Sequence, residues 1–174
     1  MKRVLLLFSA FLAITASPMV RAETTEPIDQ HMAAIRVGCV DALQGMLQVQ
    51  RSEAATRVNR GREYEALLKL VAAFNSRVVL NKLDAPALTG AASRMQSRFS
   101  QFQRHYIEYA DKMDTALNIN CKEAPVTFYD SLNEARDARA QVAADVVEMD
   151  KLLTEYQAGL DKLKGELKKV EVQP

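Results

Sequence analysis

The 174-residue sequence has no tryptophan, few other aromatic residues, six scattered glycines and only two cysteines. So few aromatic side chains favour a helical bundle with aliphatic seams over a β-rich core or an aromatic-lined pocket. The glycines form no phosphate-binding loop, and no Gly-x-Ser-x-Gly elbow, Cys-x-x-Cys pair or Glu-x-x-His pair occurs. The two histidines, His31 and His105, are interpreted as surface residues. We therefore expect no catalytic residue, no metal and no cofactor.

The first 22 residues have the pattern of a secretory signal peptide. Basic residues follow the initial methionine, residues 4–14 are apolar but too few to span a bilayer, and residues 20–22 offer a cleavage site. Cleavage would leave 20 basic and 22 acidic residues, a net charge of −2. Such a balance argues against nucleic-acid binding and bulk attraction to anionic membranes. We expect residues 23–174 to form one secreted or periplasmic domain without stable membrane insertion.

The two cysteines, Cys39 and Cys121, would then lie in an oxidising compartment. This context predicts one intramolecular disulfide, with free thiols or a bridge between chains as alternatives. The bridge would join the last interhelical loop to the foot of the first helix.

Three prolines that closely follow acidic residues mark helix starts: Pro27, Pro86 and Pro125. They predict helices over about 27–82, 86–117 and 125–170. In the last of these helices, residues alternately four and three positions apart form a heptad seam, with Arg139 as its only polar member. The seam consists of Phe128, Leu132, Ala135, Arg139, Val142, Val146, Met149, Leu153, Tyr156, Leu160, Leu163, Leu167 and Val170. This pattern predicts an all-α fold, an elongated antiparallel three-helix bundle with coiled-coil-like packing.

The stretch 50–63 interrupts the apolar pattern of the first helix. It contains Gly61 but no proline, and one glycine costs only about 1 kcal/mol in a helix interior. A single bent helix is therefore favoured, and the alternative is four helices with a break near Gly61.

A polar layer is predicted where the apolar pattern fails. Antiparallel pairing would place Arg57 and Arg60 near Glu108 and Asp111 of the second helix, with Arg139 at the same height. We interpret these residues as a layer that fixes helix register. The alternative is a docking patch for an acidic partner.

Three apolar residues lie one step off the predicted seams: Leu70, Val147 and Leu152. They are the candidates for a face that binds a partner.

Three classes of function fit these features. The first is a non-enzymatic structural or adaptor role outside the cytoplasm, in which the long helical faces bind another envelope or extracellular protein, or a second copy of this chain. The second is a holdase-type chaperone, which would need a splayed bundle or an oligomeric cavity. The third is a bundle that binds a small ligand or a cofactor.

Overall fold

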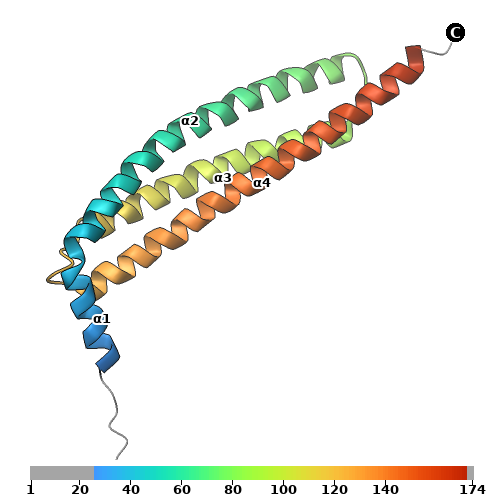
Figure 1. Cartoon of the computed structure of the whole chain (residues 1–174). Helices are drawn as coiled ribbons and strands as arrows, with labels where there is room; N and C mark the ends of the chain where they lie inside the picture. The colour runs from blue at the N-terminus through green and yellow to red at the C-terminus, as the bar shows by residue number, and fades with distance from the viewer. Residues whose placement is uncertain (1–25, 172–174) are drawn as a thin grey trace, which may run out of the picture.

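The computed structural model describes residues 26–171, which form four helices: α1 (Glu26–Val37), α2 (Cys39–Leu80), α3 (Pro86–Leu117) and α4 (Pro125–Glu171). Figure 1 shows an elongated, curved molecule in which α3 and α4 lie side by side and α2 arches along them. The described residues contain no strand. The predicted all-α class and helical bundle are confirmed. The predicted signal peptide, residues 1–22, lies outside the described residues.

The number of helices matches the four-helix alternative, but the break lies at Gly38 and not near Gly61. Helix α2 runs without interruption through Gly61. At the break, the Gly38 N–H still donates to Ala34 O, and Gly38 O accepts from the Ala42 N–H, both at 2.9 Å. The bend therefore interrupts the helix without leaving its backbone groups unpaired. It directs α1 against the start of α4 (Figure 1).

Prolines start helices as predicted. Pro86 and Pro125 are the first residues of α3 and α4, and Pro27 is the second residue of α1. Proline suits these positions because the N–H groups of the first helical turn have no intrahelical partner.

Helix α3 lies at the centre of the molecule and supplies most of the core. Its buried residues recur every three or four positions, and they are Leu88, Ala91, Met95, Phe99, Phe102, Tyr106, Tyr109, Met113 and Ala116. Because α3 is covered on two sides, it carries the largest run of buried aromatic residues in the described chain.

The buried face of α4 shares alternate positions with the predicted seam, except Val142, which is only partly buried. The shared buried positions are Phe128, Ala135, Met149, Tyr156 and Leu163. The buried positions between them are Ala138, Asp145 and Leu152, each one residue before the predicted Arg139, Val146 and Leu153. One residue is a rotation of about 100° around a helix. The predicted residues therefore face the side of α2, whereas α4 packs chiefly against α3.

The three long helices pack unequally. Helices α3 and α4 approach each other along most of their length, α2 and α3 meet over a smaller part, and the α2 and α4 backbones do not come close. Two edges of the triangular bundle are thus closed, and the third edge, between α2 and α4, is open.

Candidate functional site: the open groove between α2 and α4

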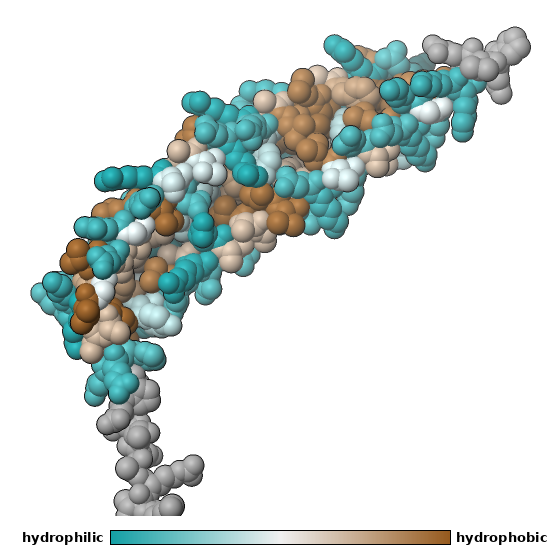
Figure 2. All heavy atoms as spheres, in the orientation of Figure 1, coloured by the Kyte–Doolittle hydropathy of each residue, from teal (hydrophilic) through white to brown (hydrophobic). Residues whose placement is uncertain are grey.

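A groove of about 560 Å³ lies along the open edge. Its floor is formed by Phe102 and Tyr106 of α3, and its α4 wall includes Val142 and Val146. Figure 2 shows hydrophobic residues gathered between α2 and α4, with hydrophilic residues around them. The groove therefore has an apolar interior that no part of the described chain fills.

Four arginines line this groove: Arg57, Arg60, Arg136 and Arg139. The Arg57 guanidinium lies over the Tyr106 ring, 4.9 Å from its centroid. Arg60 donates to the Tyr64 hydroxyl at 3.4 Å, and this hydrogen bond raises the pKa of Arg60. The positive groups thus gather at the middle of the molecule, where the sequence pattern predicted a polar layer.

One ion pair spans the groove. Arg139 of α4 donates from Nε to Glu53 Oε1 of α2 at 3.0 Å, and its Nη2 donates to the same oxygen. This hydrogen bonding raises the pKa of Arg139. The pair links two helices whose backbones do not touch, so it limits how far the open edge can widen.

A smaller hollow of about 320 Å³ continues the groove toward α1 and shares Arg136 and Arg139 with it. Tyr109 lines this hollow, and its buried hydroxyl has no hydrogen-bond partner among the described residues. A buried hydroxyl without a partner costs roughly 1–3 kcal/mol. It is the kind of group that a bound molecule can satisfy.

The predicted polar layer is only partly assembled. Arg57, Arg60 and Arg139 do face one groove, but Arg139 pairs with Glu53, a residue that the sequence argument did not select. Glu108 and Asp111 are exposed and form no ion pair within residues 26–171. The reason is register, because Arg57 lies over Tyr106 and not beside Asp111, a shift of more than one helical turn.

The predicted partner face is also partly wrong. Leu70 and Val147 are exposed to 70% and 68%, but Leu152 is 3% exposed and belongs to the core. Leu152 is buried because the face that α4 turns to α3 is rotated by one residue from the predicted seam. Its neighbour Leu153 is 36% exposed instead.

Three exposed apolar residues lie outside the lining of the groove, and we call them the apolar strip: Leu70 and Phe74 of α2 and Leu153 of α4. Leu70 and Phe74 lie four residues apart and so share one face of α2. Tyr156 of α4 donates to Asn75 Oδ1 of α2 at 3.0 Å, which places these parts of the two helices at the same height.

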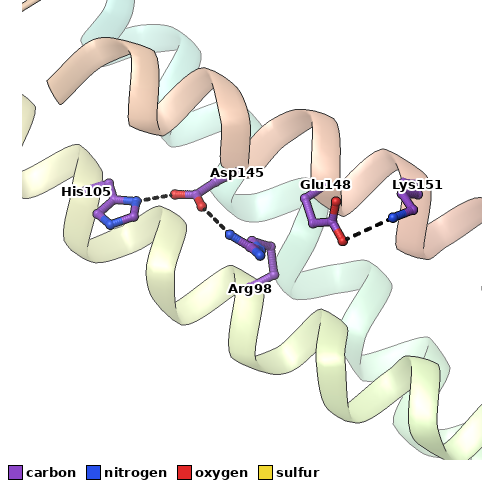
Figure 3. A network of polar contacts seen from close by, with 5 residues as sticks. All are labelled: Arg98, His105, Asp145, Glu148 and Lys151. Carbon is purple, nitrogen blue, oxygen red and sulfur yellow. Dashed lines mark hydrogen bonds and ion pairs between the residues drawn. The ribbon is translucent and has the colours of Figure 1, made fainter. Parts of the chain in front are cut away.

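A buried ionic network, missed by the sequence argument, joins α3 to α4. Asp145 is 1% exposed and accepts from Arg98 Nη1 at 3.0 Å, while His105 Nδ1 lies 2.6 Å from its other oxygen (Figure 3). His105, predicted to be a surface residue, is thus half-buried against a carboxylate. The only signal for this network in the sequence was an acidic residue, Asp145, one position before the apolar seam residue Val146. Because both carboxylate oxygens are engaged, the network fixes the register of α3 against α4.

The predicted disulfide between Cys39 and Cys121 is formed, with Cα atoms 5.6 Å apart and both residues buried. It ties the first residue of α2 to the loop between α3 and α4. The pairing agrees with the foot-of-helix position that the sequence indicated.

Burial raises the pKa of several tyrosines of the core. Burial raises the pKa of Tyr106 to about 12, with smaller contributions from Glu53 and Tyr109. Burial likewise raises the pKa of Tyr64 and of Tyr109. All three belong to the region where α2 packs on α3, so that interface depends on neutral phenols.

Among residues 26–171, no helix has the length and apolarity needed to cross a membrane. In the same part of the chain, no three His, Cys, Asp or Glu side chains are arranged to hold a metal ion. No family model, curated protein or solved structure matches the chain.

Proposed function

We propose that this protein is a non-enzymatic adaptor outside the cytoplasm, which binds an amphipathic helix of another protein along the apolar strip. The single observation that carries the proposal is the open third edge of the bundle, where the α2 and α4 backbones do not come close and only side chains such as Tyr156 and Asn75 meet. A partner helix lying there would cover Leu70 and Phe74 and complete a four-helix arrangement.

The location outside the cytoplasm is supported by the intramolecular disulfide, because such bridges persist in oxidising compartments. The first 22 residues, with their signal-peptide pattern, agree with this location.

A photo-activatable cross-linker at the strip tests the proposal in the native host. The tagged protein, with the cross-linker placed near Leu70, should capture one dominant partner, and Leu70→Glu or Leu153→Glu should weaken that association. Val79→Glu is the matched control. Val79 is 64% exposed, and nine positions along an α-helix place it about 180° around α2 from Leu70. Equal effects of the three substitutions, or none at all, would exclude the strip as the binding face.

A holdase-type chaperone is a second candidate, favoured by the same splaying of α2 from α4. An apolar edge of this kind would hold unfolded clients with little selectivity. Two measurements distinguish these functions. A holdase suppresses the aggregation of unrelated denatured proteins, and it is cross-linked to a broad mixture of them. An adaptor does neither.

A further inference from the structure

We propose that the arginine-lined groove binds a single-chain anionic amphiphile, of the class of long-chain carboxylates. This site is distinct from the apolar strip and does not depend on the protein-binding role.

The shape of the groove suits an extended alkyl chain. Its α4 wall runs from Arg136 to Val147, a length of about 16 Å at the rise of an α-helix. Its volume of about 560 Å³ lies in the range of small-molecule sites. Phe102 and Tyr106 form the floor under part of this length, so a chain would exchange water for aromatic and aliphatic surface.

The charges at the same place suit an anionic head group. Arg57 and Arg136 form no ion pair within the described residues. Arg57 lies over the Tyr106 ring, and Arg136 donates to the side chain of Asn133 at 3.1 Å. Guanidinium groups bind carboxylates through paired N–H donors, so two free arginines on opposite walls can hold one between them.

The acidic groups near the groove do not cancel this charge. Glu53 forms an ion pair with Arg139, and Asp150 and Glu63 lie near Arg60. A surplus of positive charge therefore remains at Arg57 and Arg136.

The Tyr109 hydroxyl supplies a second, independent sign of a ligand. It is buried without a partner, and both Glu53 and Arg139 influence its pKa, so it lies close to their ion pair. Tyr109 and Arg136 line the same hollow, so a ligand carboxylate held by Arg136 would lie near this donor while Glu53 stays on Arg139. Binding would then relieve the cost of the unpaired hydroxyl.

The Arg139–Glu53 ion pair, which spans the groove, favours an alkyl chain over a protein helix as the ligand of this groove. A helix with its side chains is about 10 Å across, so it can lie only over the side chains that link α2 to α4 and cannot reach the floor of the groove. A flexible alkyl chain can pass under Arg139 and Glu53 and lie on Phe102. The structure thus places the head group among the arginines and the tail along Val142 and Val146.

Three probes with one tail length test the proposal on the full mature protein: dodecanoate, dodecanol and dodecyltrimethylammonium, each below its micelle-forming concentration. Titration calorimetry should show one saturable site for dodecanoate, with the alcohol weaker by on the order of tenfold or more and the cation weaker still. Equal binding of dodecanoate and dodecanol, or no saturable binding of dodecanoate, would overturn the proposal.

Two variants locate the site. Arg57→Gln and Arg136→Gln should each weaken dodecanoate binding by on the order of tenfold and leave dodecanol binding unchanged. Arg62→Gln is the matched control, because Arg62 is an exposed arginine of α2 on the other side of that helix. All three positions are exposed, so the variants should keep the melting temperature of the parent protein. An equal loss in Arg62→Gln would show general charge attraction and contradict the assigned site.

Discussion

The two interfaces of α3 are built from side chains of different size, and they hold their neighbouring helices at different distances. Against α4 the contact includes small residues, and a Cβ on Gly159 would lie 2.7 Å from Leu88 Cδ2. Against α2 the contact is aromatic, with the Tyr64 ring edge-on to Phe99 and Phe102 at centroid distances of 6.2 and 5.5 Å. Interaxial distance follows the side chains at the contact. The rings therefore keep α2 away from the tightly packed pair, and this spacing opens the groove.

The disulfide connects the two regions, and its loss should have the largest effect. It closes a loop of 82 residues between the start of α2 and the α3–α4 loop. Replacing Cys39 and Cys121 together by alanine should lower the free energy of unfolding by about 4 kcal/mol in the chain-entropy model. Urea denaturation measures the loss.

Hydrogen exchange locates the effect of that double replacement. The amides of α2 should lose protection first, because α2 has the looser interface, while α3 and α4 stay protected as a pair. Simultaneous loss of protection in all three helices would contradict the division into a tight pair and a loosely held helix.

Two glycines test the difference in packing distance. Gly159→Val should destabilise by about 2 to 3 kcal/mol, because the new side chain must displace Leu88 in the close α3–α4 contact. Gly61→Ala, on α2, meets nothing within 4 Å and should stabilise by about 0.5 to 1 kcal/mol through helix propensity. Thermal and urea unfolding check both. Similar effects at the two positions would show that α2 packs as closely as α4.

High pH should loosen the aromatic interface selectively. The folded state raises the pKa of Tyr106 to about 12 from 10, so the folded protein holds its phenolic proton longer than the unfolded chain. Stability is then complete below pH 10 and falls as the pH rises toward 12, by on the order of 2 kcal/mol. Tyrosinate absorbance and hydrogen exchange should show α2 opening in this window before the α3–α4 pair.

A phenylalanine variant provides the control for that pH experiment. Tyr106→Phe lacks the titrating hydroxyl and should lose less stability between pH 10 and 12 than the parent protein. An unchanged pH dependence would assign the effect to other groups.

The sequence predicted the parts of the fold that depend on local signals. Proline positions located helix starts, and the predicted seam of the last helix contains five of the buried residues of α4. The rotation of α4 was not predictable from the same pattern, because its apolar residues cover a face wide enough for two heptad phases. Choosing Asp145 over Val146 as the buried position required knowing that α3 is the main neighbour. The predicted α2–α3 register failed for a similar reason, since it depends on where α2 ends and α3 begins, and the structure places Arg57 over Tyr106. The groove follows from both of these non-local features.

The buried carboxylate of the tight interface should have a smaller effect than the close glycine contact. Asp145→Asn keeps the side-chain size but removes the charge that Arg98 and His105 share, and it should cost about 1 to 2 kcal/mol. The cost stays modest because both partners remain about one third exposed and regain water when the charge is lost. Asp161→Asn, at an exposed position of α4, should leave the unfolding midpoint in urea unchanged. A larger loss at Asp145 than at Gly159 would mean that the ionic network, and not close packing, distinguishes the α3–α4 interface from the α2 side.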